Sequence, residues 1–196
     1  MHALTGIIIK KQNKGEHDQI ITAYSKEYGK IALVARGVRK GSAKLSGHLS
    51  LLHLSTIGFV PGRQTKVLTT VSELESFPAM KKNLEKAQAA LHIAHVVDAY
   101  TIEEAHDEDL FHLLLGALDY LNRKEMKRLE LKFFLRYFEF KFLSVLGYEP
   151  EDKTIVYALG NDQVMLSEKE LDKMALDFGR YFQNIYPAPP VRQNTR

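Results

Sequence analysis

The chain has 196 residues, of which 45% are hydrophobic and 26% are charged, so it can form one or two globular domains with a buried core. It contains no cysteine, which excludes disulfides, thiolate metal sites and cysteine nucleophiles. The formal net charge of +3 is unevenly spread: residues 1–75 carry 11 Lys+Arg against 5 Asp+Glu, a net of +6, and the remainder carries 16 against 19, a net of −3. Positive charge concentrated in one part of a chain is expected where that part meets nucleic acid.

The N-terminal part of the sequence predicts an all-β domain. Short apolar runs with many β-branched residues alternate with turn sequences rich in Gly, Asn and Pro. Five short strands of this kind suit a small closed barrel. An oligonucleotide-binding barrel (OB-fold) and an SH3-like barrel both fit this count. The expected strands are Leu4–Lys11, Gln19–Ser25, the first part of Gly29–Leu45, Leu49–Val60 and Lys66–Ser76.

A basic loop follows the third expected strand. It carries Arg36, Arg39, Lys40 and Lys44, and no acidic residue occurs between Lys30 and Gly62. Glycines keep such a loop open and flexible, and clustered cations attract polyanions such as the phosphates of nucleic acid. The alternative is a solvated cationic loop without a ligand, because charged runs usually lie in solvent.

Helical periodicity begins after Phe77-Pro78. Apolar residues three or four positions apart predict a first helix to about Thr101 and a second helix with Asp107 as its N-cap. The third expected helix, about Lys124–Leu146, is apolar nearly all round, which is typical of a helix packed on most sides. The expected apolar face of the first helix consists of Met80, Leu84, Ala87, Leu91, Ala94 and Val97.

The C-terminal segment contains signals for a hairpin and a last helix. Gly160-Asn161-Asp162 lies between two apolar runs and predicts a hairpin over residues 154–166. The capping box Ser167-Glu168-Lys169-Glu170 predicts the start of a helix to about Asn184. We therefore expect an α+β protein. Its parts are a barrel domain over residues 1–77, a mainly helical domain over 78–185 that includes the hairpin, and an extended or disordered tail over 186–196.

The sequence lacks the common signatures of catalysis. It has no phosphate-binding loop of the G-x-x-x-x-G-K-[ST] type, no G-x-G-x-x-G and no H-E-x-x-H. His92 and His95 are spaced to share a metal, but packing residues at this spacing are much commoner, and we expect no metal, no cofactor and no enzymatic activity. The N-terminus lacks the pattern of a signal peptide, and no apolar stretch approaches the roughly 18 residues of a membrane-spanning helix. We expect a soluble, cytoplasmic protein.

Several motifs stand in a specific order along the chain. They are I-I-I-K-K at Ile7–Lys11, G-E-H-D-Q-I-I-T-A-Y-S-K-E-Y-G-K-I at Gly15–Ile31, A-R-G-V-R-K at Ala35–Lys40, the turn at Ser42–Gly47, E-L-E-S at Glu73–Ser76 and F-x-x-K-F-L-x-x-L-G-Y-E-P at Phe138–Pro150. In this order and spacing the chain, from about Leu4 to Pro150, resembles the family of the bacterial DNA repair protein RecO.

The resemblance implies a fold and a function. Members of this family have an N-terminal OB-fold followed by a helical domain. They bind single- and double-stranded DNA, anneal complementary strands, and with the partner RecR help to load RecA onto DNA coated with single-strand-binding protein (SSB). They are not enzymes, and they act in the bacterial cytoplasm at the nucleoid. Many members carry four cysteines as a zinc site after G-Y-x-P, but residues 151–166 contain none here.

Three sets of residues are the predicted binding sites. The barrel cations should contact DNA phosphates, some barrel aromatics are candidates for base stacking, and a basic stripe on the third helix should bind the C-terminal tail of SSB, as the family does on its helical domain. The DNA-binding set is Lys10, Lys11, Arg36, Arg39, Lys40, Lys44, Arg63 and Lys66; the stacking set is Tyr24, Tyr28 and Phe59; the SSB-tail set is Arg128, Lys132, Arg136 and Phe133.

Two functions of other classes also fit the residues. An RNA-binding or ribosome-associated barrel protein would share the basic loop. A protein-interaction module would carry its positive charge incidentally, and it would then show no salt-dependent affinity for nucleic acid.

Overall fold

The computed structural model of the protein describes residues 1–40, 45–148 and 166–185, and the chain divides into two compact units, Met1–Met126 and Lys127–Arg196. The domain boundary expected near residue 77 falls inside the first unit, because helices α1–α3 belong to the same compact unit as the barrel. The expected hairpin over 154–166 lies almost wholly outside the described residues, as does the tail over 186–196.

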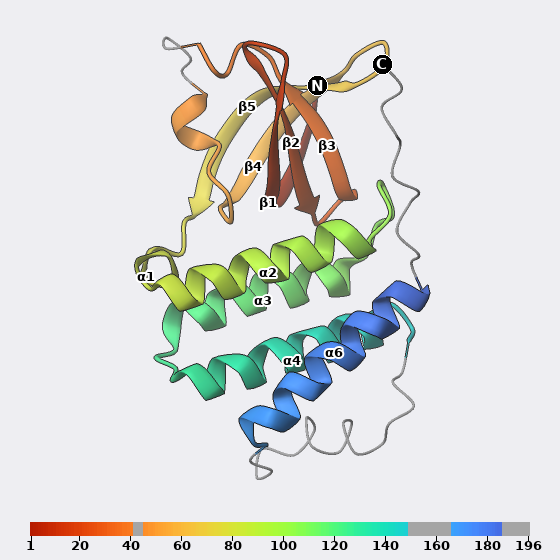
Figure 1. Ribbon diagram of the computed structural model, residues 1–196. Coiled ribbons are helices and arrows are strands. Elements are labelled where there is room, and N and C mark those ends of the chain that lie inside the picture. The colour runs from red at the N-terminus through yellow and green to blue at the C-terminus, as the bar shows by residue number, and fades with distance from the viewer. Residues whose placement is uncertain (41–44, 149–165, 186–196) are drawn as a thin grey trace. The chain divides into compact units, whose positions relative to one another are not determined.

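The first unit begins with a closed five-stranded barrel (Figure 1). Its strand order is β1-β2-β3-β5-β4, and β4 closes the barrel by pairing with β1. All pairs are antiparallel except β3 with β5. This arrangement is the OB-fold, so of the two barrels that fitted the sequence the oligonucleotide-binding type is confirmed. The strands are β1 His2–Lys14, β2 Asp18–Ser25, β3 Gly29–Ala35, β4 Leu54–Pro61 and β5 Lys66–Glu75.

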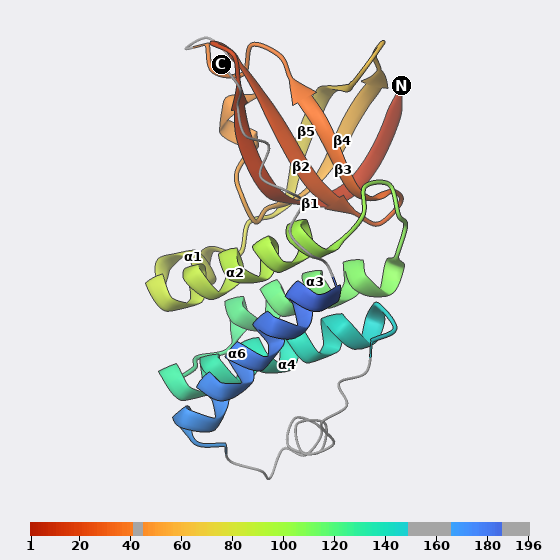
Figure 2. The same ribbon diagram turned by 45° about the vertical axis from the view of Figure 1, so that its right-hand side comes forward.

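Strand β1 pairs with two neighbouring strands. Its first half, from His2 to Ile7, pairs with β4, and its second half, to Lys14, pairs with β2. The register shifts between Ile8 and Lys10, and such a bulge bends a strand. Figure 2 shows β1 running down one side of the barrel, bending and rising along another side.

The barrel core follows the alternation in the sequence. In β3, Ile31, Leu33 and Ala35 are buried in the main cluster, as the period of two predicts. A short helix, η1 (Ser46–His48), precedes β4, and Leu49 beside it is buried in the same cluster.

Three helices complete the first unit: α1 (Pro78–Lys82), α2 (Leu84–Tyr100) and α3 (Glu108–Arg123). The expected first helix is broken at Asn83, whose side chain caps α2 by accepting a hydrogen bond from the Lys86 backbone N–H at 3.1 Å. Asp107 caps α3 in the same way, as the sequence predicts. Both views show α2 lying across one end of the barrel (Figures 1 and 2).

The apolar face expected for the first helix is partly wrong. Leu84 and Leu91 are exposed, whereas Ala90 and Ile93 are buried. The break at Asn83 restarts the helix and so changes which residues share its packed face.

The second unit contains α4 (Arg128–Val145) and α6 (Glu168–Ile185), which pack against each other. Phe142 on α4 meets Phe182 on α6, with ring centroids 6.0 Å apart, and stacks on Phe138 of its own helix at 6.1 Å. The predicted capping box of α6 is confirmed, because Glu170 accepts a hydrogen bond from the Ser167 N–H at 2.7 Å. Among the described helices, none has the length and apolar composition needed to cross a membrane.

Candidate nucleic-acid interface

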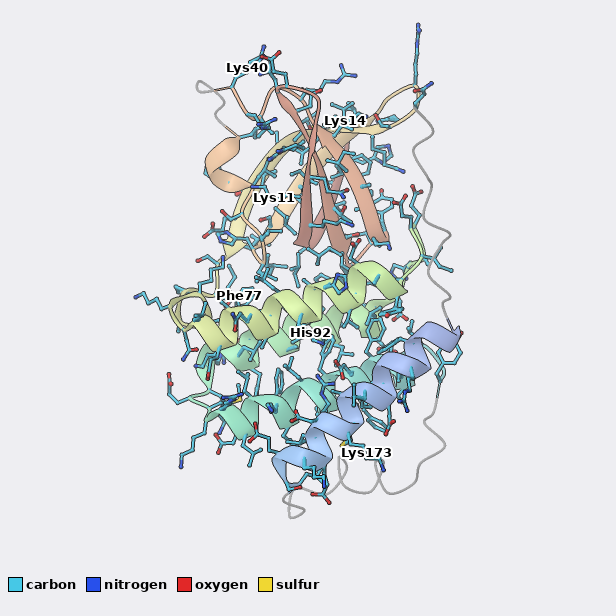
Figure 3. The ribbon with its side chains drawn as sticks, in the orientation of Figure 1. Lys11, Lys14, Lys40, Phe77, His92 and Lys173 are labelled. Atoms are coloured by element: carbon cyan, nitrogen blue, oxygen red, sulfur yellow. The ribbon has the colours of Figure 1, made fainter. Side chains whose placement is uncertain are left out.

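Five strand ends meet at one end of the barrel, which we call the rim. The pair Lys14–Asp18 marks the end of β1 and the start of β2, and Ala35 ends β3 beside Gln19. The start of β5 lies beside both the end of β3 and the end of β4. The rim loops are therefore the β1–β2 turn, the loop after β3 and the β4–β5 turn. Lys14 and Lys40 lie at this end of the barrel, away from α2 (Figure 3).

The rim presents exposed cations from all three loops. Among the residues that the structure describes, these side chains make no hydrogen bond or ion pair with one another or with the rest of the protein. Cations without an internal partner keep their full charge available for an anion. The rim cations are Lys14, Arg36, Lys40 and Arg63. Lys14 was missing from the predicted DNA-binding set, although a lysine at the end of a strand, just before Gly15, could have been recognised as a turn cation. Lys44, which was in that set, lies outside the described residues.

Arg39 has a different position from its neighbours. Its guanidinium donates to the carbonyl oxygens of Gly15 at 3.2 Å and Glu16 at 3.0 Å, and its backbone N–H donates to His17 at 3.0 Å. Asp18 accepts a hydrogen bond from the Gly37 N–H at 2.7 Å. These contacts join the loop after β3 to the β1–β2 turn, so they fix the shape of the rim.

Three predicted DNA-binding lysines are engaged within the protein. Lys10 lies 2.6 Å from the carboxylate of Asp98 on α2, Lys66 pairs with Glu104, and Lys11 donates to the carbonyl oxygen of Leu49. All three belong to the barrel, but the structure does not bring them into the set of unpaired rim cations.

Two of the three stacking candidates are buried. Tyr24 is fully buried and Phe59 is 2% exposed, so neither ring is accessible for a base. Burial, together with Asp107, raises the pKa of Tyr24 well above its usual range, as expected for a hydroxyl removed from water. Tyr28 is partly exposed and meets Phe59 edge to face at 5.6 Å. The sequence reasoning missed His2, an exposed residue whose ring stacks on Phe59 at 5.2 Å.

The predicted basic stripe lies on α4 of the second unit. Lys132 pairs with Glu168 at 2.6 Å and with Asp172 at 2.9 Å, both on α6. These carboxylates raise the pKa of the Lys132 ammonium. Arg136 is largely buried and lies 2.8 Å from Glu139.

The N-terminal part of the stripe is more open. Arg128 is 74% exposed and reaches Glu168 only at 4.0 Å. Phe133 is partly buried. Lys132 and Arg136 therefore already have close carboxylate partners, whereas the only carboxylate near Arg128 in the described residues lies 4.0 Å away.

In the parts of the chain that the structure describes, no three His, Cys, Asp or Glu side chains come close enough together to bind a metal.

Comparisons with known proteins agree with this fold. The family model described as "Recombination protein O N terminal" matches residues 1–77, and "Recombination protein O C terminal" matches residues 81–152. The chain is similar to the DNA repair protein RecO of Roseiflexus sp. (strain RS-1), with 34% identity over 145 residues, which cover 74% of this chain and 50% of that protein. It is also similar to RecO of Acetivibrio thermocellus, with 32% identity over 146 residues, which cover 74% of this chain and 57% of that protein.

The chain spans about half the length of the curated relatives it matches. The two matched regions together include the barrel, α2, α3 and α4. The chain belongs to the family of the DNA repair and recombination protein RecO.

Proposed function

We propose that this protein mediates DNA repair and homologous recombination by binding DNA at the rim of its barrel. The observation that carries the proposal is a set of exposed cations at the three adjacent rim loops that have no partner among the described residues: Lys14, Arg36, Lys40 and Arg63. Their long side chains suit phosphate oxygens, which single and double strands both present. Membership of the RecO family supports DNA as the polyanion.

In this proposal the protein also anneals complementary strands. Two strands repel each other through their phosphates, and a protein that neutralises phosphates lowers this repulsion. With RecR as partner, it would then help RecA to load onto DNA coated with SSB. These partner activities rest on the family alone.

The α4 stripe is the proposed site for the acidic C-terminal tail of SSB. Arg128 is the open cation to which the tail would first bind, and Phe133 would contact an apolar end. At Lys132, the carboxylates of the tail would have to replace Glu168 and Asp172, which already hold that ammonium group. Arg136 is largely buried and paired with Glu139, so it would contribute least to the binding of the tail.

Fluorescence anisotropy with a labelled single strand tests the rim. We expect Arg36→Gln with Lys40→Gln to weaken binding of all sequences alike, because phosphate contacts carry no sequence information. The matched control is Lys82→Gln with Lys124→Gln, which removes the same charge from exposed sites in α1 and just after α3 in the same unit. Equal losses in both variants would mean that net charge alone drives binding and that the rim is not the site.

A competition assay separates DNA from RNA. The proposal predicts that unlabelled single-stranded DNA displaces the probe at least as well as RNA of the same length. An RNA-binding barrel would give the reverse order, and a protein-interaction module would give no salt-dependent binding to compete.

A further inference from the structure

A second group of barrel lysines differs from the unpaired rim cations, because each of them contacts an acidic segment of the same unit. We call residues 98–108, which are the end of α2, the link to α3 and the first residue of α3, the acidic segment. It contains five acidic side chains. The four lysines that it contacts come from β1, the β2–β3 turn, β3 and β5. They are Lys10, Lys26, Lys30 and Lys66.

Two of these lysines converge on one residue at the end of α2. Lys10 Nζ lies 2.6 Å from the Asp98 carboxylate, and Lys30 Nζ donates to the Asp98 carbonyl oxygen at 2.6 Å. The carbonyl ends of a helix attract cations, so both contacts are favourable. Lys30 is 9% exposed, and burial lowers the pKa of its ammonium group. Because it is buried, Lys30 is not accessible to a ligand.

The other two lysines are more accessible. Lys26 lies 2.9 Å from Glu108 and Lys66 pairs with Glu104, and each side chain keeps part of its surface in water. Each carboxylate holds an ammonium group that would otherwise be available to a phosphate oxygen of DNA.

The backbone fixes the acidic segment against the barrel. The Glu104 N–H donates to the Lys30 carbonyl oxygen at 2.8 Å, and Glu103 forms a parallel bridge with Lys30. Gly29 has φ +63°, and an added Cβ there would lie 1.9 Å from the Ala105 carbonyl oxygen. This close approach requires glycine, so the segment is held by more than its exposed ion pairs.

We infer that the acidic segment determines where DNA lies on the barrel: its carboxylates occupy Lys26 and Lys66 and so confine the phosphates to the unpaired rim cations. This inference rests on the proposed DNA binding and adds a positioning role for Glu104 and Glu108. It also explains why Lys66, which the sequence suggested as a phosphate contact and which begins β5 at the rim, is not among the unpaired rim cations. Removing the two carboxylates should release two cations to the DNA backbone.

The slope of log affinity against log salt measures this release. A single strand contributes a slope of about −0.7 for each phosphate contact. Glu104→Gln with Glu108→Gln should therefore make the slope steeper by about 1.4. The control is Glu85→Gln with Asp109→Asn, which changes the net charge equally at exposed residues that form no ion pair with a lysine in the described part of the chain. The control should raise affinity without the change in slope.

A second pair of variants keeps the test decisive if the first variant is unstable. Lys26→Gln with Lys66→Gln should leave the salt slope of the otherwise unchanged protein as it is, because these lysines are already occupied. In the fourfold variant that combines these lysine changes with Glu104→Gln and Glu108→Gln, the slope should no longer be steeper than that of the unmodified protein. A slope reduced by the lysine changes alone would overturn the inference, and so would an unchanged slope in the folded glutamine variant.

The same measurements distinguish a failure of the proposed function from a failure of this inference. If the unmodified protein shows no salt-dependent DNA binding, the DNA-binding proposal is wrong, and the inference falls with it. If the unmodified protein binds through the rim but the acidic-segment variants behave like their control, only the inference is wrong.

Discussion

The guanidinium of Arg39 lies 3.0 Å from the carbonyl oxygen of Glu16, so a cation in the middle of the basic loop is joined to the neighbouring turn. The same group also donates to Gly15. Lys40, the next residue, is exposed and makes no such contact within the described part of the chain. Two adjacent cations thus have different roles: one shapes the rim and the other is open to a ligand.

Single substitutions should separate these two roles. We expect Arg39→Gln to lower the free energy of unfolding by about 1 kcal/mol, because it removes hydrogen bonds to two carbonyl oxygens, and to leave the DNA salt slope nearly unchanged. Lys40→Gln should leave stability unchanged and make the slope shallower by about 0.7. Urea denaturation and anisotropy measure the two quantities. The opposite pattern would show that Arg39 is the phosphate contact.

Two glycines with the same backbone angle offer a matched test of how the acidic segment docks. Gly29 and Gly15 both have φ +63°, but only Gly29 faces another backbone, at Ala105. Gly15→Ala should cost about 1 kcal/mol from the left-handed backbone, whereas Gly29→Ala should cost about 2–4 kcal/mol because the added methyl overlaps a carbonyl. Denaturation midpoints and slopes give both values. Equal losses of stability in the two variants would mean that the segment around Ala105 moves away from the added methyl group without a free-energy cost.

The sequence predicted the barrel and the basic loop because both depend on local patterns. Strand alternation identified Ile31, Leu33 and Ala35 as core residues, and unbroken positive charge after Ala35 marked the loop. Strand pairing was not predictable from the count of strands. The parallel pair of β3 with β5, which separates the two barrel types, joins residues far apart in the chain.

The carboxylate partners of the barrel lysines could not be predicted either, because they also lie far away in the sequence. Lys10 and Asp98 are 88 positions apart, and no local pattern connects them. Aromatic rings carry a similar ambiguity, since a strand residue such as Tyr24 can stack on a base or pack in the core, and core packing is the commoner role. The structure places Tyr24 in the interior. The exposed ring of His2 could not be predicted as a surface aromatic, because a terminal histidine carries no sequence signal.

His53 should make stability depend on pH. Its Nδ1 lies 2.6 Å from Glu73, but burial, and then the nearby Lys81, outweigh this carboxylate and lower the pKa of His53. A lowered pKa means that protonation favours the unfolded state, so stability is full above the ordinary value of about 6.5 and falls as the pH drops through it.

Urea unfolding of the parent and of His53→Gln at pH 7.5 and 5 checks this expectation. The variant should lose less stability on acidification than the parent. His48→Gln, at an exposed position in η1, is the control and should behave like the parent. A parent and a His53→Gln variant with the same dependence on pH would contradict the assignment.

The α4 stripe can be tested through its internal partners. If the stripe binds the SSB tail, Arg128→Glu with Lys132→Glu should weaken binding of the tail peptide more than tenfold, or about 1.4 kcal/mol, and spare binding to bare DNA. Glu168→Gln with Asp172→Asn should strengthen it, because Lys132 then lacks its carboxylate partners. Calorimetry measures both. Unchanged peptide affinity in the charge-reversed variant would place the site elsewhere.

The salt dependence of single-strand binding tests the central claim most directly. If four to six phosphates are neutralised, the slope of log affinity against log salt should be about −3 to −4. Replacing the four rim cations Lys14, Arg36, Lys40 and Arg63 by Gln should make this slope shallower by about 2.8, while the same number of changes at exposed helix cations should not. A slope that stays near −3 in the rim variant would contradict the account.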